Sequence, residues 1–300
     1  WIRMPKPSTA YAIQRDWNPA DRAAYLRDAL AAADPRVDFS RYDVVYFVAD
    51  PDAPGVDSDA TKVVNLDTPL RADGTDIRRV VTVFEKHPPD RLVLAHETGH
   101  VFDLPDLYHR PADGKGDWDT YVGDWDLMGS QFGLAPDLFG WHKWKLGWLE
   151  PRQVVCVKEV GVTRVTLEPL DAGPGMPVTG AAGSPIFGFG RGTKLAVVRT
   201  GPDSVLAFEA RGPVGNDTAT CRSGILVYRV RSGTVSGSGP IQVIDAHPHT
   251  EACWETSVYP PLADAPITLG ETFKVPGTTV RVTAEARTAA GAWTVKITAS

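Results

Sequence analysis

The sequence predicts an α+β protein, with a mixed α/β region over residues 1–150 followed by an antiparallel β-sandwich over residues 151–300. Two observations predict this organisation. Helical patterns alternate with short apolar strands in the first half, whereas the second half consists of short strands separated by glycine, proline or charged residues. Hydrophobic residues make up 43% of the 300-residue chain, so each half can bury a core of its own.

The elements of the first half follow from their start signals and apolar patterns. Asn18 is a favoured N-cap and Pro19 suits the first helical position, which predicts a helix that extends to about Ala33. The nearly continuous apolar run at 42–48 predicts a buried strand. Further strands are predicted at 62–66 and 79–85, and further helices at 91–102 and 135–146.

Strands in the second half are predicted where apolar and β-branched residues lie between turn residues. They are 164–167, 194–200, 205–211, 225–230, 241–245, 279–287 and 293–298. Residues 171–192 are rich in glycine and proline, which predicts a long loop. For Glu209, which lies between apolar strand residues, a salt bridge at a strand edge is favoured over a paired buried acid.

The strongest functional signal is the pentapeptide from His96 to His100, which reads HETGH. Residues four apart on a helix lie on one face, so both imidazoles can bind one ion, and Glu97 follows the first of them. This H-E-x-x-H pattern is typical of zinc hydrolases, in which the histidines bind zinc and the glutamate takes a proton from the activated water. The alternative is a surface helix with two hydrogen-bonded histidines and a chance glutamate.

A third zinc ligand is expected just beyond this helix. Leu104 precedes a proline and is therefore disfavoured in a helix, so the chain should turn after His100 and bring Asp106 toward the metal. Asp103 is less favoured, because it lies at the fraying end of the helix. Acids further along the chain have capping or calcium-binding alternatives; they are Asp117, Asp124 and Asp126.

The stretch HETGHVFDLPDLY, followed by VGDWDLMGS at 122–130, resembles the secreted immune inhibitor A-type metallopeptidases. That family carries H-E-x-G-H-x-x-G-L-P-D-L-Y and then W-D-L-M-S, and the resemblance covers about 38–150. It implies a zincin-like catalytic domain, with Asp106 at the spacing from His96 that metzincin-type peptidases use for their third ligand. Met128 would lie beneath the metal. Asp103 stands where the family has glycine, which permits a tight turn at positive φ.

The function implied by the motif and the resemblance is that of a secreted zinc-dependent endopeptidase acting on proteins or peptides. Glu97 would be the general base, and Tyr108, Tyr121 and His142 are candidate donors to the oxyanion. Two alternatives stay open. One is a degenerate peptidase that binds proteins or glycans, and the other is a different zinc hydrolase, such as an aminopeptidase or a deacylase.

Charge and cysteine content restrict the partners and the environment. A net charge of −6 without a basic run disfavours nucleic acid and anionic membrane surfaces, and no apolar run is long enough to span a membrane. Cys221 and Cys253 flank one block of strands and are predicted to form a disulfide, with Cys156 as a buried thiol. Three free thiols of a cytosolic protein are the alternative.

Two groups of acidic residues could supply calcium with oxygen ligands. The first follows the predicted strand at 42–48 and is interpreted as solvated. The second follows the predicted metal-binding helix, and for it calcium stays open beside zinc as a second ion. The groups are Asp50, Asp52, Asp57 and Asp59, and then Asp113, Asp117, Asp119, Asp124 and Asp126.

Overall fold

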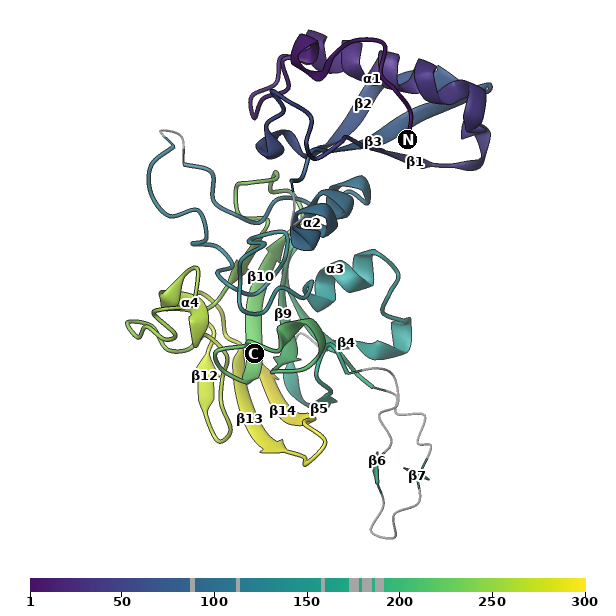
Figure 1. Cartoon of the computed structure of the whole chain (residues 1–300). Coiled ribbons are helices and arrows are strands. Elements are labelled where there is room, and N and C mark those ends of the chain that lie inside the picture. The colour runs from purple at the N-terminus through teal and green to yellow at the C-terminus, as the bar shows by residue number, and fades with distance from the viewer. Residues whose placement is uncertain (87–89, 112–113, 158–159, 173–177, 180–184, 187–191) are drawn as a thin grey trace. The chain divides into compact units, whose positions relative to one another are not determined.

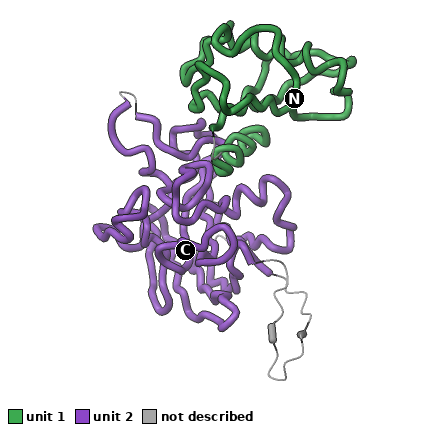
Figure 2. Tube along the Cα trace, viewed as in Figure 1, with its two compact units in different colours: residues 1–104 green, residues 105–300 purple. Residues whose placement is uncertain are grey.

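The computed structural model describes all residues except 87–89, 112–113, 158–159, 173–177, 180–184 and 187–191. It is a mixed α/β protein whose sheets are mostly antiparallel, as the sequence predicts at this level (Figure 1). The chain forms two compact units, Trp1–Leu104 and Pro105–Ser300 (Figure 2). These units reflect packing alone, so the predicted boundary at residue 150 between a catalytic region and a β-sandwich stays a prediction.

The first unit contains a three-stranded sheet covered on one face by a helix (Figure 1). The strands are β1 (Val44–Val48), β2 (Lys62–Ala72) and β3 (Thr75–Val83), in the order β1-β3-β2. β1 is parallel to β3, and β2 is antiparallel to it. Helix α1 (Pro19–Ala33) begins at the predicted cap, because the Asn18 side chain accepts a hydrogen bond from the Ala20 N–H. Leu26 of this helix packs in the same core as Val80 of β3.

The run at 42–48 predicted a buried strand, and this prediction is wrong, because none of its residues is fully buried. β1 is an edge strand: Val45 and Phe47 pack against the core beneath α1, and on the opposite face only Val44 packs against apolar residues. Phe47 packs against that core, whereas Tyr46 and Val48, which point to the opposite face, are 39% and 62% exposed. A continuous apolar run therefore does not require cover on both faces.

The predicted strands at 62–66 and 79–85 are parts of one longer hairpin. β2 and β3 pair through a turn at Asp73 and Gly74, whose φ values are 49° and 73°. Positive φ at both central residues is typical of the type I′ turn, for which Asp-Gly is a favoured pair. The Asp-Gly pair is a signal that the sequence prediction missed.

Helix α2 (Arg91–Val101) forms where predicted and contacts β2 and β3. Asp90 caps it, because its side chain accepts a hydrogen bond from a backbone N–H of the first turn. The chain leaves the helix at Asp103, whose φ is 62°, and the Leu104 N–H then donates to the Gly99 carbonyl oxygen at 3.1 Å. Asp103 therefore adopts the left-handed conformation that commonly ends helices, although glycine is preferred there.

The second unit contains two larger sheets that contribute to one apolar core. Their strands are β4 (Val154–Val157), β5 (Gly161–Leu167), β8 (Leu195–Gly201), β9 (Ser204–Arg211), β10 (Gly224–Arg231), β11 (Ile241–Val243), β12 (Thr272–Lys274), β13 (Arg281–Arg287) and β14 (Trp293–Ala299). The orders are β11-β10-β9-β8-β4 and β12-β13-β14-β5. Neighbouring strands are antiparallel except β4 and β8. Phe208 of the first sheet and Val282 and Val295 of the second lie in the shared core.

Most strands of the second unit lie close to their predicted bounds, but β4 and β12 were not predicted. The predicted loop at 171–192 falls mostly outside the described residues, and the rest of it includes β6 (Val178–Thr179) and β7 (Pro185–Ile186). Short 3₁₀ helices occur at Ser8–Tyr11, Asp34–Arg36, Phe39–Arg41, Ser58–Ala60, Pro151–Gln153 and Gly215–Asp217.

The helix predicted at 135–146 is shorter, and a short helix α4 (Pro260–Ala263) was not predicted. Only α3 (Gly140–Lys145) forms, because backbone groups before it bind side chains instead of one another. The Ala135 and Asp137 carbonyl oxygens both accept hydrogen bonds from Arg211. Within the described part of the chain, no helix has the length and apolar composition needed to cross a bilayer.

The predicted disulfide between Cys221 and Cys253 is confirmed, with Cα atoms 6.1 Å apart. The prediction that Cys156 is buried is wrong, because its side chain is exposed. It lies on β4, an edge strand in which Val155 and Val157 turn toward the core and the residue between them turns away.

Candidate metal centre

Helix α2 places His96 and His100 one turn apart on the same face. Their Nε2 atoms are 3.1 Å apart and their rings are perpendicular. His96 is 4% exposed, and His100 is partly buried. Two nitrogens bound tetrahedrally to one zinc ion at about 2.0–2.1 Å would lie about 3.3 Å apart. The observed separation is close to that value, and it is also the length of a hydrogen bond between the two rings.

A backbone carbonyl fixes how His100 presents its ring. The His100 Nδ1 atom lies 2.8 Å from the Leu104 carbonyl oxygen, which can only accept a hydrogen bond. Nδ1 therefore carries the proton in the neutral ring, and the Nε2 lone pair can serve as a metal ligand. Leu104 reaches this position because the chain turns at Asp103.

The predicted third ligand, Asp106, joins the same group. One ligand atom from each of His96, His100 and Asp106 lies within 4.8 Å of the other two, and all three residues come from the continuous stretch 96–106. Among the residues that the structure describes, this is the only group of at least three histidine, cysteine or acidic side chains that converges in this way. Two neutral imidazoles and one carboxylate form a donor set that suits zinc.

Two other acids considered as third ligand, Asp103 and Asp124, bind other groups of the protein. Asp103 forms an ion pair with Arg79 at 3.1 Å, and the same guanidinium donates to the Val101 carbonyl oxygen. Asp124 is buried and accepts hydrogen bonds from Leu134, Ser257 and Val258. None of these acids belongs to the converging group.

Glu97 lies outside the group of ligands, next to the edge of the sheet in the first unit. Its Oε2 atom accepts a hydrogen bond from the Val63 N–H of β2 at 2.7 Å. β2 pairs with β3 on one side only, so its outer edge can offer this N–H. One oxygen of the carboxylate is therefore held by the protein, and the side chain is partly buried.

Met128, predicted to lie beneath the metal, is fully buried in the second unit. Its N–H donates to Asp126 at 2.7 Å, and its carbonyl oxygen accepts from the Leu107 N–H at 2.8 Å. This backbone bond fixes the residue that follows Asp106. The structure thus connects the WDLM segment to the third member of the group through the backbone.

The three candidate oxyanion donors have different surroundings. Burial and the charge of Asp106 raise the pKa of Tyr108, so its hydroxyl keeps its proton at neutral pH. The Tyr121 hydroxyl is 3.1 Å from His109 Nδ1. His142 is 1% exposed, with its Nδ1 atom 3.2 Å from Asp126, and a side chain so enclosed is a poor donor to a substrate.

The two acidic groups considered for calcium contain acids that bind backbone N–H groups. Asp50 and Asp57 of the first group accept from N–H groups two residues later, as turn caps do. In the second group, Asp126 is buried and accepts from the Met128 and Phe139 N–H groups. Asp113 lies outside the described residues. A calcium site stays a prediction.

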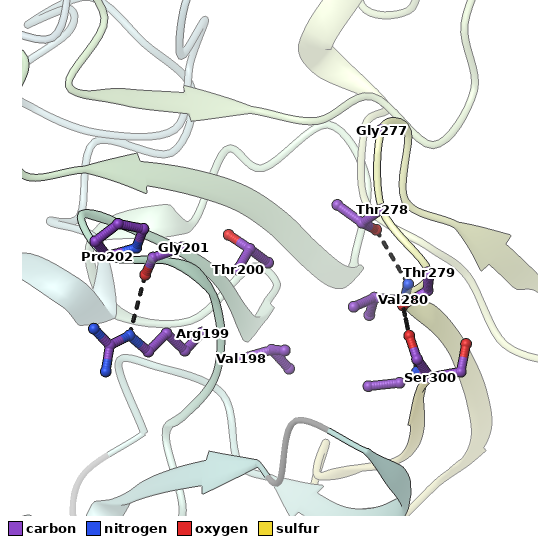
Figure 3. A pocket seen from close by; sticks show the side chains of 11 residues that line it. Val198, Arg199, Thr200, Gly201, Pro202, Gly277, Thr278, Thr279, Val280 and Ser300 are labelled. Carbon is purple, nitrogen blue, oxygen red and sulfur yellow. Dashed lines mark hydrogen bonds between the residues drawn. The ribbon is translucent and has the colours of Figure 1, made fainter.

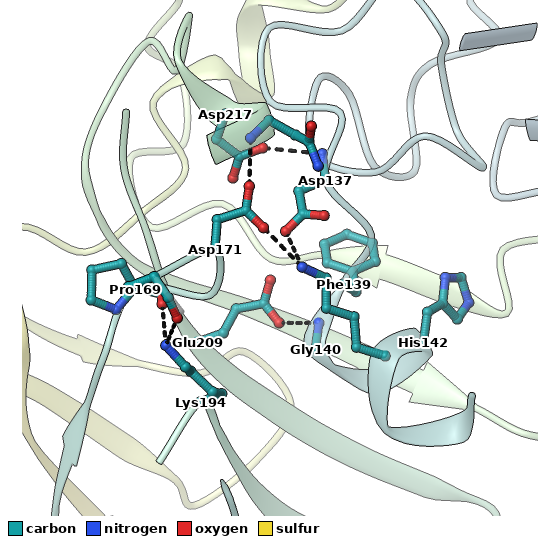
Figure 4. A network of polar contacts seen from close by, with 12 residues as sticks. Asp137, Phe139, Gly140, His142, Pro169, Asp171, Lys194, Glu209 and Asp217 are labelled. Atoms are coloured by element: carbon teal, nitrogen blue, oxygen red, sulfur yellow. Dashed lines mark hydrogen bonds and ion pairs between the residues drawn. The ribbon is translucent and has the colours of Figure 1, made fainter. Parts of the chain in front are cut away.

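A separate buried polar network lies in the second unit (Figure 4). Glu209 was predicted to form a salt bridge at a strand edge, but β9 is a central strand and the residue is fully buried. It forms an ion pair with Arg211 at 3.0 Å and accepts hydrogen bonds from Tyr228 and Gly140. Burial raises the pKa of Glu209 against the opposing effect of the guanidinium. The paired buried acid, the less favoured alternative, is therefore correct.

Two cavities of the structure lie away from the converging group. One of about 580 Å³ is lined by residues 198–202, 277–280 and 299–300 of the second unit (Figure 3). Its polar contacts include one within a turn, from Arg199 to the Gly201 carbonyl oxygen, and one between distant residues, from the Thr279 hydroxyl to the Ser300 carbonyl oxygen. Another, of about 1020 Å³, lies in the first unit between the N-terminal residues and β1. Neither is lined by His96, Glu97 or His100.

No known family model matches the chain, and a search of curated proteins finds no match. A functional assignment therefore depends on the residues and their geometry.

Proposed function

We propose that this protein is a zinc-dependent endopeptidase in which His96, His100 and Asp106 bind zinc and Glu97 is the general base. The observation that carries the proposal is the 3.1 Å separation of the two Nε2 atoms, together with the Leu104 carbonyl that fixes the His100 tautomer. A hydrogen bond between the two histidines alone would not account for the carboxylate that converges on them. The arrangement supports a metal site more directly than the sequence motif does.

Zinc bound there would activate water and polarise the scissile carbonyl as a Lewis acid. Glu97 would accept the proton of the attacking water and deliver it to the leaving amine. The Val63 N–H holds one carboxylate oxygen and leaves the other to carry this proton. Tyr108, which keeps its proton at neutral pH, would be suited to donate to the oxyanion.

We also infer a zincin-like catalytic region at 1–150, a β-sandwich at 151–300 and secretion of the protein. A sheet with mixed strand directions followed by the histidine-bearing helix supports the first. Two sheets that share one apolar core support the second. The Cys221–Cys253 disulfide is compatible with an extracellular protein and supports the third.

The test is hydrolysis of casein and of a peptide blocked at both ends, by the wild type and by Glu97→Gln. Glutamine retains an oxygen that can accept from the Val63 N–H but cannot take up a proton. We expect the rate to fall by roughly 10²–10⁴-fold while zinc content, measured by atomic absorption, stays unchanged. A chelator should abolish wild-type activity. Glu85→Gln, which changes a glutamate outside the group, is the matched control and should behave as the wild type.

The other outcomes separate the alternatives. A wild type that holds zinc but cleaves nothing would favour the degenerate, binding form of the fold. Cleavage restricted to peptides with a free terminus would favour an exopeptidase. Loss of zinc from a folded Glu97→Gln variant would contradict the assignment of this residue as base.

A further inference from the structure

A loop of the second unit reaches the segment that carries Asp106. The loop joins β10 to β11, and two of its residues contact this segment. The Gly237 N–H donates to the Asp106 carbonyl oxygen at 3.0 Å, and the Gly237 carbonyl oxygen accepts from the Arg110 N–H at 3.4 Å. Gly237 is buried with a φ of 73°, a conformation that favours glycine. The loop therefore fixes the backbone of the segment 106–110 at both of its ends.

Ser236 contacts the side chain of Asp106 as well as its backbone. The Ser236 Oγ atom accepts a hydrogen bond from the Asp106 N–H at 2.8 Å and donates one to the Asp106 Oδ2 atom at 3.1 Å. One hydroxyl thus links the backbone and the carboxylate of the same residue. This pair of bonds restricts the side-chain torsions of the aspartate.

Arg110, a cation near this carboxylate, contributes less to its orientation than Ser236 does. Arg110 Nη2 lies 3.5 Å from Asp106 Oδ2, at the limit of hydrogen bonding, and is only 2.5 Å from the Tyr108 hydroxyl. The guanidinium is therefore directed mainly at the phenol. Ser236 makes the shorter contact to Oδ2, and it uses neither the Asp106 carbonyl oxygen nor the buried Oδ1 atom.

We infer that Ser236 is a positioning residue for the third metal ligand: its hydroxyl holds the Asp106 carboxylate in the orientation that binds zinc. The inference rests on the proposed metal site. Hydrogen bonds to ligating carboxylates orient them before the metal arrives and commonly change metal affinity by about 10–100-fold. Because Ser236 is exposed and water can replace part of its role, the expected effect is at the lower end of that range.

The experiment measures zinc affinity of the whole chain by competition with a chromophoric chelator. Ser236→Ala should bind zinc about tenfold more weakly than the wild type. Ser236→Thr keeps the hydroxyl and should restore most of the affinity. Ser238→Ala removes a hydroxyl from the same loop, away from Asp106, and should match the wild type. The absorption spectrum of the cobalt-substituted protein should change in Ser236→Ala alone, because it reports the geometry of the ligands.

The outcomes distinguish this inference from the proposed function. A wild type that binds zinc, with Ser236→Ala binding it equally well, would overturn the positioning role and leave the metal site standing. Equal losses in Ser236→Ala and Ser238→Ala would assign the effect to the loop as a whole and overturn the role of the hydroxyl. A wild type that binds no zinc would overturn the proposed function and this inference with it.

Discussion

The molecule contains two clusters of polar side chains that differ in the groups that bind their charges and lone pairs. Around Arg211, charge is compensated within the protein: the guanidinium binds Asp217 at 2.6 Å and Glu209 at 3.0 Å and also donates to three backbone carbonyl oxygens. In the group formed by His96, His100 and Asp106, atoms that serve as metal ligands converge instead. In the first cluster a cation of the chain binds the acids, whereas the second has the composition of a site for an added cation.

The two clusters should therefore respond differently to mutation. Removing one member of a compensated buried network leaves an unmatched charge, so stability should fall. Removing one member of a metal site should mainly reduce the affinity for the metal, since the remaining groups are neutral or partly solvated.

The largest effect is expected for Arg211→Met. Methionine fills part of the space but leaves Glu209 and Asp217 buried without their cation. We expect the free energy of unfolding to fall by about 3–5 kcal/mol, the range for breaking a buried ion pair from one side. Urea denaturation followed by tryptophan fluorescence measures it.

Arg164→Met is the control for this prediction. Arg164 forms an ion pair with Glu285 at 2.9 Å, but its side chain is 58% exposed, so stability should change little. Equal losses in the two arginine variants would show that burial and compensation do not set the cost, and the contrast between the clusters would fail.

What the sequence could predict was local. Asn18 and Asp90 cap the helices as predicted, because capping depends on the few residues that follow. His96 and His100 share a face because helix geometry sets that spacing. The turn at Asp103 is also local, and it brings the Leu104 carbonyl to the imidazole.

The contacts that the sequence could not predict join distant segments. Ser236 is 130 residues from Asp106, and a serine in a glycine-rich loop carries no sign of its partner. Arginine usually lies at the surface of a protein. The burial of Arg211 therefore depends on acids and carbonyls supplied by three other segments. The same contacts shortened the helix predicted at 135–146, because tertiary hydrogen bonds overrode the local signal.

A smaller change in the free energy of unfolding is expected when the group formed by His96, His100 and Asp106 gains or loses zinc. At free zinc about 100 times the dissociation constant, the wild type should gain about 2.7 kcal/mol in the free energy of unfolding, and a chelator should remove the gain. Asp106→Asn should lose most of this gain and change little without metal. Asp103→Asn is the matched control, because asparagine tolerates positive φ and the residue is outside the group. Thermal unfolding with and without zinc tests both; a full gain in Asp106→Asn would contradict its role as ligand.

The smallest effect concerns Asp119, which is intermediate between the two clusters: it is partly buried and has a negative neighbour. Burial, followed by the charge of Asp124, raises the pKa of Asp119 from 3.8 to about 6. Because the pKa is higher in the folded state, the stability associated with the protonated carboxyl is fully present below pH 3.8 and is lost as the pH rises through about 6. Asp119→Asn cannot ionise, so its free energy of unfolding relative to the wild type should increase between pH 4 and pH 7. The increase should be about 1 kcal/mol or less, because solvent screens a partly exposed group.

Urea denaturation across this pH range measures the change in the free energy of unfolding. A difference that does not change with pH, or one that decreases, would show that burial and the charge of Asp124 do not raise the pKa of Asp119 in the folded protein.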